Sequence, residues 1–275
     1  MNKYKIIFVD IDDTLNPSNG KVSDYTKEVM KKIKDKGIKI VVNTGRSAQY
    51  AVAKSKEAGL SNIIISSNGS EIYNYEEDKI IYSNPIPNNE IKDIYNYCQS
   101  LNITLILNTI KNRYINKLDY NYNSEPVEYF EDIDKLLEET QVNQMIILSD
   151  NYDRMLVIPN LFKEKFPKLK VVHSSIALIE QTRIKNKEYY HDLAYGNVAK
   201  STGIVELLDY FNIEPEEAIA IGNGYDDICM MDVVKTGIAV ENANDQLKEV
   251  ADIVTESSAN DGVAKILSKL ILEEN

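Results

Sequence analysis

Residues 6–14 read Ile-Ile-Phe-Val-Asp-Ile-Asp-Asp-Thr, and this stretch decides the fold. Four consecutive apolar residues are typical of a strand that is covered on both faces, as the strands of parallel sheets are. Carboxylates follow at once, at Asp10, Asp12 and Asp13. Open parallel sheets bind ligands beyond the carboxyl ends of their strands, so this order predicts a buried strand that brings carboxylates to a binding site.

Outward from this strand, the chain alternates between helix and strand. Ser23 and Ser47 stand where helix N-caps belong, and Gly37 and Gly59 stand where those two helices end. Strand, helix, strand, helix, strand in this order predicts a parallel, doubly wound sheet. The second and third strands are expected at residues 38–42 and 62–65.

The pattern changes after Asn68-Gly69, a dipeptide typical of a hairpin between two strands. Pro85 and Pro87 then interrupt the chain. Beyond them, the pattern predicts an α+β insert whose strands are antiparallel in part, with two helices on one face. The expected helices are 88–101, 131–139 and one that ends before Pro167, and the expected strands are 104–107, 113–117, 145–148, one around Val171, and 178–183.

The alternation returns at Lys200, where a helix is expected to run to about Phe211. We therefore expect residues 1–83 and 189–275 to form one α/β domain, a Rossmann-like doubly wound parallel sheet, with residues 84–188 inserted into it as a second, α+β domain. The later strands are expected at 218–221, 238–240 and 252–255, and the later helices at 228–234, 244–250 and 263–271.

The composition of the 275 residues excludes several classes of protein. The 31 Lys+Arg and 43 Asp+Glu give a net charge of −12, which argues against a surface for nucleic acid or anionic membrane. Cys98 and Cys229 lie far apart, so neither a disulfide framework nor a cysteine zinc site is expected. His173 and His191 are too few for a multi-histidine metal site. Without a signal peptide or a run of roughly 20 apolar residues, the expected location is the cytoplasm.

Four polar clusters follow strands or open a helix of the predicted sheet. Such clusters are weak signals singly, since loops after strands are polar in most proteins. Their joint placement is a strong signal, because the carboxyl ends of parallel strands meet at one edge. The clusters are Asp10 to Thr14, Asn43-Thr44-Gly45-Arg46, Lys200, and Gly222-Asn223-Gly224-Tyr225-Asp226-Asp227.

With these clusters, the sequence resembles the haloacid dehalogenase (HAD) superfamily of phosphatases, specifically the Cof-type IIB branch with an inserted cap domain. The family's D-x-D-x-T motif stands here as DIDDT, its second motif as Thr44-Gly45 and its third as Lys200. The fourth motif, G-D-x-x-N-D, is altered to GNGYDD at residues 222–227. The Asn-Gly before the cap and the late ADIVT and DGV stretches also match, so the resemblance covers nearly the whole chain.

The resemblance implies a role for each matching residue. Asp10 would be the nucleophile that forms an aspartyl phosphate, and Asp12 the acid and base that exchanges protons with the leaving group and water. Thr44, the amides beside Gly45, and Lys200 would bind the phosphoryl oxygens. Arg46 either assists in this or is an ordinary solvated arginine.

The resemblance also implies Mg²⁺ as cofactor, held by oxygen ligands. They would be the Asp10 carboxylate, the backbone carbonyl of Asp12 and a residue of the fourth motif. Asn223 stands where the family has its acidic ligand, and Asp226 where it has Asn, so the two look exchanged. Asn223, Asp226 and Asp227 all remain candidates for the metal.

These observations predict a Mg²⁺-dependent phosphatase for small phosphorylated metabolites, sugar phosphates or nucleotide-like cofactors, as a monomer or weak homo-oligomer. A phosphomutase of the same superfamily and a non-catalytic phosphometabolite-binding module are the alternatives, and the Asn223/Asp226 exchange favours the second. A phospho-accepting receiver domain is discounted because it is less than half this length. Asn108, Arg113 and Tyr114 of the insert either select the substrate or are ordinary solvated residues.

Overall fold

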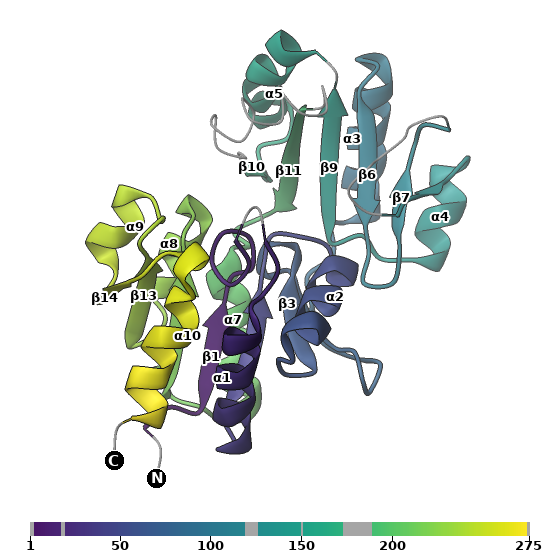
Figure 1. The fold of residues 1–275 in the computed structure, drawn as a ribbon. Helices are drawn as coiled ribbons and strands as arrows, with labels where there is room; N and C mark the ends of the chain where they lie inside the picture. Colours follow the sequence, from purple (N-terminus) through teal and green to yellow (C-terminus); the bar gives the residue numbers. More distant parts are fainter. Residues whose placement is uncertain (1–2, 18–19, 119–125, 150, 173–188, 274–275) are drawn as a thin grey trace. The chain divides into compact units, whose positions relative to one another are not determined.

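The computed structural model describes residues 3–17, 20–118, 126–149, 151–172 and 189–273. The chain divides into two compact units, drawn in Figure 1: residues 1–82 with 199–275, and residues 83–198. The first unit is an α/β domain with a largely parallel sheet, which confirms the predicted fold class.

The described residues of the first unit form an eight-stranded sheet in the order β14-β13-β12-β1-β2-β3-β4-β5. The six strands from β14 to β3 are parallel to their neighbours, and β4 runs antiparallel to β3. In chain order the strands are β1 (Ile6–Val9), β2 (Lys39–Asn43), β3 (Ile63–Ser66), β4 (Glu71–Asn74), β5 (Lys79–Ser83), β12 (Ala218–Gly222), β13 (Thr236–Val240) and β14 (Ile253–Thr255).

β1 lies inside this sheet, between β2 and β12. All four of its apolar residues are fully buried, as the continuous apolar run predicts. Packing contacts join α10 to α1 and α1 to α2, and a second set joins α7, α8 and α9. The helices are α1 (Asp24–Asp35), α2 (Ala48–Ala58), α7 (Lys200–Phe211), α8 (Ile228–Met231), α9 (Asp245–Val250) and α10 (Gly262–Leu267).

The predicted helix starts are confirmed by their caps. The Ser23 side chain accepts a hydrogen bond from the Thr26 amide at the start of α1, and the Ser47 side chain accepts one from the Tyr50 amide at the start of α2. These bonds satisfy amides that have no partner inside the helix. The hairpin after β3 is also confirmed, although it turns through a short 3₁₀ segment, η1 (Ser67–Gly69).

The described residues of the second unit form a six-stranded sheet in the order β10-β11-β9-β6-β7-β8. Three helices pack on one face of it, where the sequence predicted two, and share one apolar core with it. The helices are α3 (Asn88–Ser100), α4 (Ile133–Glu139) and α5 (Tyr152–Lys165). The strands are β6 (Thr104–Asn108), β7 (Arg113–Ile115), β8 (Glu128–Tyr129), β9 (Gln144–Ser149), β10 (Leu169–Val172) and β11 (Tyr189–Tyr195).

The predicted boundary at residue 189 differs from the observed division, which falls between residues 198 and 199. The reason is β11, which pairs antiparallel with both β9 and β10 and therefore belongs to the second sheet. The strand predicted at residues 178–183 and the histidine at position 173 lie outside the described residues.

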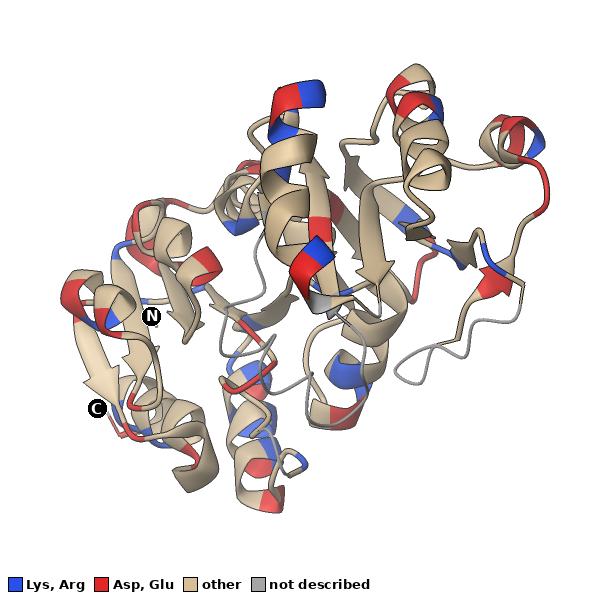
Figure 2. Ribbon diagram, turned by 90° about the horizontal axis from the view of Figure 1, so that it is seen from above, with Lys and Arg blue, Asp and Glu red and all other residues tan. Residues whose placement is uncertain are grey.

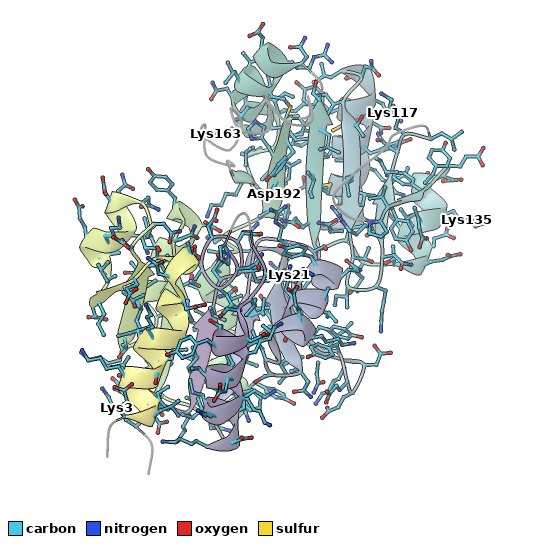
Figure 3. The ribbon with its side chains drawn as sticks, viewed as in Figure 1. Lys3, Lys21, Lys117, Lys135, Lys163 and Asp192 are labelled. Atoms are coloured by element: carbon cyan, nitrogen blue, oxygen red, sulfur yellow. The ribbon has the colours of Figure 1, made fainter. Side chains whose placement is uncertain are left out.

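Within the described residues of both units, no helix is both long and apolar enough to cross a membrane. Figure 2 shows basic positions interspersed with acidic ones along the helices. In Figure 3, Lys3 lies at the end of the first unit where β1 begins, and Lys21 lies at the opposite end, where β1 ends.

Candidate active site

The loops that follow β1, β2 and β12 meet at one edge of the first sheet, because these strands are parallel neighbours in register. Val9, the last residue of β1, lies beside Val42 of β2 and Ile221 of β12. The Asp10 amide donates to the Ile221 carbonyl at 3.0 Å, which fixes the loop after β1 against β12. The convergence of these loops is as the sequence predicts.

Lys200 is the centre of this site. Its ammonium nitrogen lies 2.8 Å from Asp10 Oδ1, 2.8 Å from Asp226 Oδ2 and 2.6 Å from Asp227 Oδ1. Lys200 is buried, as are Asp10 and Asp227, whereas the Asp226 side chain is 39% exposed. Residues separated by up to 217 positions in the sequence therefore form one ionic cluster.

Lys200 is held in place through its backbone. It is the first residue of α7, and the Asn43 side-chain amide donates to its carbonyl at 3.0 Å. The Thr202 hydroxyl accepts from the Ala199 amide at 3.1 Å and so caps the helix. Asn43 is fully buried at the end of β2. Asn43 thus links the second predicted cluster to the third, a contact that the sequence pattern does not predict.

Asp227 shapes the loop that follows β12. Its Oδ2 accepts from the backbone amides of Asn223 at 2.9 Å and of Gly224 at 2.8 Å, while Oδ1 faces Lys200. A Cβ atom on Gly222 would lie 2.5 Å from the Asp227 Cβ, so this close approach requires glycine. Both carboxylate oxygens of Asp227 are therefore engaged inside the protein.

Thr14 connects the first and fourth motifs. Its hydroxyl lies 3.1 Å from Asp10 Oδ2 and 3.0 Å from Asn223 Oδ1. A hydroxyl has a single hydrogen to donate, so it serves one of these oxygens at a time. Both oxygens thus lie within 3.1 Å of the same hydroxyl, and each keeps acceptor capacity to spare. Thr14 is the last residue of the first motif, and the motif alone does not predict either contact.

The charges around Lys200 shift the pKa values of their neighbours. Burial raises the pKa of Asp10 well above its usual range; the Lys200 ammonium opposes this shift, and the carboxylates of Asp227 and Asp226 add to it. Burial by itself lowers the pKa of Lys200, but the carboxylates outweigh burial and hold that pKa well above its ordinary value. Three carboxyl groups therefore surround one ammonium.

Within the described ranges, no set of three or more His, Cys, Asp and Glu side chains is arranged to hold a metal ion by itself. A hard divalent cation nevertheless also accepts amide and backbone oxygens, waters and substrate phosphate. Asp10 Oδ2 and Asn223 Oδ1, which share the Thr14 hydroxyl, provide one carboxylate and one amide oxygen of this kind. The carboxyl groups of the cluster also outnumber its single ammonium, so the residues present fit a cation.

Asp12 is turned toward the start of α2. Arg46 Nε donates to Asp12 Oδ2 at 2.8 Å, and the Tyr50 hydroxyl donates to Asp12 Oδ1 at 2.8 Å. The side chains of Asp12 and Arg46 are 41% and 36% exposed. The sequence predicted that Arg46 either assists in phosphate binding or is solvated; in the structure it also pairs with Asp12.

Thr44 and Gly45 lie against the turn after β3. The Thr44 carbonyl accepts from the Asn68 amide at 3.2 Å, and the Thr44 hydroxyl accepts from the Arg46 amide at 3.2 Å. A Cβ atom on Gly45 would lie 2.7 Å from Asn68 Oδ1, so a side chain there would displace Asn68. No hydrogen bond between the described residues joins this segment directly to Asp10 or Lys200; Asn43 provides the link.

Comparison with known proteins identifies the family. The model for haloacid dehalogenase-like hydrolases matches residues 7–267. A 5-amino-6-(5-phospho-D-ribitylamino)uracil phosphatase of Bacillus subtilis, YcsE, is 24% identical over 273 residues, which are 98% of this chain and 96% of that protein. The chloroplast endoribonuclease YBEY of Arabidopsis thaliana is 25% identical over 95% of this chain, and the chain spans 46% of its length.

The fold is shared with solved structures. A haloacid dehalogenase-like hydrolase from Bacteroides thetaiotaomicron superimposes with a TM-score of 0.84 at 24% sequence identity. The superposition covers 98% of this chain and all of the other. Both units of the chain therefore have counterparts in that structure.

Proposed function

Because the chain belongs to the family of haloacid dehalogenase-like hydrolases, we propose that it is a phosphatase that hydrolyses phosphate monoesters of small metabolites through an aspartyl phosphate on Asp10. The observation that carries the proposal is the Asp10 carboxylate, buried at the end of β1 and 2.8 Å from the Lys200 ammonium. A nucleophile and a cation in contact are what phosphoryl transfer to a carboxylate requires.

In the proposed reaction, an Asp10 oxygen attacks phosphorus while the bond to the leaving oxygen breaks. Protonated Asp12 gives its proton to that oxygen, and then, as a carboxylate, takes a proton from the water that attacks the aspartyl phosphate. The water oxygen bonds to phosphorus, the Asp10–phosphorus bond breaks, and inorganic phosphate leaves. Asp12 ends protonated again, so the cycle closes.

The phosphoryl oxygens carry the charge that must be stabilised. We assign this function to Lys200, to the Thr44 hydroxyl and to the amides beside Gly45. Lys200 already faces Asp10, so a phosphoryl group on Asp10 would lie within its reach. Thr44 is buried, and its hydroxyl hydrogen has no acceptor among the described residues, which supports a donor function toward a bound anion.

We assign the binding of Mg²⁺ to the Asp10 carboxylate, the Asp12 carbonyl and Asn223 Oδ1. Mg²⁺ neutralises charge on the phosphoryl oxygens when it is bound. Asn223 is favoured over Asp227 because both Asp227 oxygens are engaged by Lys200 and by backbone amides. It is favoured over Asp226 because Asp226 pairs with Lys200, whereas the Asn223 oxygen contacts the Thr14 hydroxyl, which also contacts Asp10.

The family and the name of one relative support a proposal for the substrate class. That relative, YcsE, is named for a substrate that joins a phosphorylated ribityl chain to a uracil ring. We propose a substrate of related size, a sugar phosphate or a nucleotide-like phosphate. The negative charge of the whole chain, −12, is consistent with a small ligand bound in a local cluster rather than with a polyanion.

The test is hydrolysis of p-nitrophenyl phosphate with and without Mg²⁺, compared between the wild type and Asp10→Asn. We expect Mg²⁺-dependent release of phosphate by the wild type and a loss of at least about a thousandfold in Asp10→Asn. Asp24→Asn, which removes an exposed carboxylate at the start of α1, is the matched control and keeps full activity. Activity that persists in Asp10→Asn, or binding of phosphate without turnover by the wild type, would refute the proposal.

A further inference from the structure

Both carboxylate oxygens of Asp12 are held by side chains at the start of α2. Arg46 Nε donates to Oδ2 and the Tyr50 hydroxyl donates to Oδ1, each at 2.8 Å. The Arg46 guanidinium also lies over the Tyr50 ring, 5.4 Å from its centroid. Each of the three side chains therefore orients the next, and the direction of the Asp12 carboxylate is fixed at two points.

The two donors stand on either side of the N-cap of α2. Arg46 lies just before the N-cap residue Ser47, whose backbone is extended, and Tyr50 lies in the first turn of the helix. The segment that begins α2 therefore presents both side chains to Asp12 in the loop after β1.

Stability does not account for the arrangement. The Asp12 and Arg46 side chains are 41% and 36% exposed, and ion pairs as exposed as this contribute little to folding. A carboxylate has about four lone-pair positions, so two donors still leave each oxygen able to exchange a proton. The contacts thus fix orientation without blocking proton transfer.

We propose that Arg46 and Tyr50 are positioning residues for proton transfer: they hold the Asp12 carboxyl group in the orientation from which it protonates the leaving oxygen and later deprotonates water. This inference rests on the proposed function, in which Asp12 is the acid and base. Both residues contact Asp12, and neither contacts the substrate in this scheme. A misplaced general acid loses most of its rate contribution, because proton transfer requires hydrogen-bond reach in the transition state.

The other candidate function of Arg46, phosphate binding, makes different predictions. A phosphate ligand contributes to every substrate and to binding of inorganic phosphate. A positioning residue for the general acid matters most when the leaving group departs poorly without a proton, and little when the leaving group is stable as an anion. The dependence on the leaving group therefore separates the two functions, and a purely structural role would not produce it.

The experiment compares Tyr50→Phe and Arg46→Lys with the wild type on p-nitrophenyl phosphate, a good leaving group, and on phenyl phosphate, a poorer one. The parameter is kcat/KM, which reports the first chemical step. We expect Tyr50→Phe to lower kcat/KM roughly tenfold on phenyl phosphate and less than about twofold on p-nitrophenyl phosphate, out of a general-acid contribution of about 10²–10⁴. The inhibition constant of inorganic phosphate stays unchanged.

Tyr75→Phe is the matched control, since it removes a tyrosine hydroxyl of the same unit that donates to the Ser61 carbonyl. It keeps wild-type values on both substrates. A second test repeats Tyr50→Phe in an Asp12→Asn background, where the loss on phenyl phosphate must disappear if Tyr50 acts through Asp12. Thermal melts of each variant show that it is folded.

Equal losses on the two substrates, weaker inhibition by inorganic phosphate, or a loss that persists in the Asp12→Asn background would overturn the positioning function. These outcomes are distinct from failure of the proposed function, which would be seen in the wild type and in Asp10→Asn before any change is made in α2.

Discussion

Glu71 offers a direct test of the electrostatics of the first unit. It is the first residue of β4 and is fully buried. Its Oε2 accepts hydrogen bonds from the hydroxyls of Ser66 at 2.7 Å and Ser67 at 3.0 Å, whereas Oε1 has no hydrogen-bond partner in the described part of the chain. Burial raises the pKa of Glu71 to about 7, although the two serine hydroxyls act in the opposite direction.

The sign and the size of the effect follow from this pKa. The folded protein favours the protonated carboxyl group, so its contribution to stability is fully present below the unfolded pKa of 4.5 and is lost as the pH rises to about 7. A difference of about 2.5 units at 1.36 kcal/mol per unit amounts to about 3 kcal/mol. Glu71→Gln removes the ionisation and should make this part of the stability independent of pH.

The assay is urea unfolding of the wild type and Glu71→Gln, followed by circular dichroism at pH 5 and pH 8. We expect Glu71→Gln to be more stable than the wild type by about 2–3 kcal/mol at pH 8, with most of that difference gone at pH 5. Glu77→Gln, which changes an exposed glutamate in the turn after β4, is the control and leaves the pH profile unaltered. A difference between Glu71→Gln and the wild type that is the same at both pH values would refute the reasoning.

Three further predictions concern the candidate active site. Asn223→Asp should tighten Mg²⁺ binding roughly tenfold in calorimetric titration, because it adds a charged ligand; an unchanged affinity would exclude Asn223 as a ligand. Lys200→Met should lower the stability by about 3–5 kcal/mol at pH 7, since it leaves buried carboxylates without their cation; an unchanged melting temperature would contradict this. Gly222→Ala should lower the free energy of unfolding by about 1–3 kcal/mol, because its Cβ would collide with Asp227. Wild-type stability in that variant would show that the loop moves to accommodate the Cβ atom.

Local signals predicted the elements of the first unit well. The serine caps of α1 and α2 form the hydrogen bonds expected of them, and the apolar run of β1 is fully buried. These features depend on residues within a few positions of one another. Asp13 has a positive φ of 60°, a conformation that aspartate tolerates better than most residues.

Long-range pairing was harder to predict. β11 contains Tyr, His, Asp and Ala as well as Leu, and neither a continuous apolar run nor strict alternation marks it. It becomes a strand because β9 and β10 supply partners on both of its edges. The residues of β11 alone do not reveal these partners, so the predicted domain boundary fell ten residues before the observed one.

In the active site, the direction of the side chains was likewise not predictable from the sequence. The motifs predicted that Asp12 and Arg46 would lie at one edge of the sheet, but not that they would pair, because their contact joins residues 34 positions apart and depends on their rotamers. The same holds for Asn43, whose contact with the Lys200 carbonyl spans 157 positions.

The exchange of Asn223 and Asp226 shows why the position of a charge matters more than its count. The exchange leaves the number of carboxylates in the fourth motif unchanged, yet Asp226 faces Lys200 while Asn223 faces Thr14. Coulomb energy depends on the distance between charges, so moving a carboxylate within the motif changes the electrostatic potential around Lys200 even though the number of carboxylates is the same. The ammonium of Lys200 is shared among three carboxylates and offers less net attraction to an incoming phosphate than it would with two. In the proposed reaction, Asp226→Asn should therefore lower the KM for a phosphate monoester, and a KM that stays the same or rises would mean that the Asp226 charge is already compensated from another side.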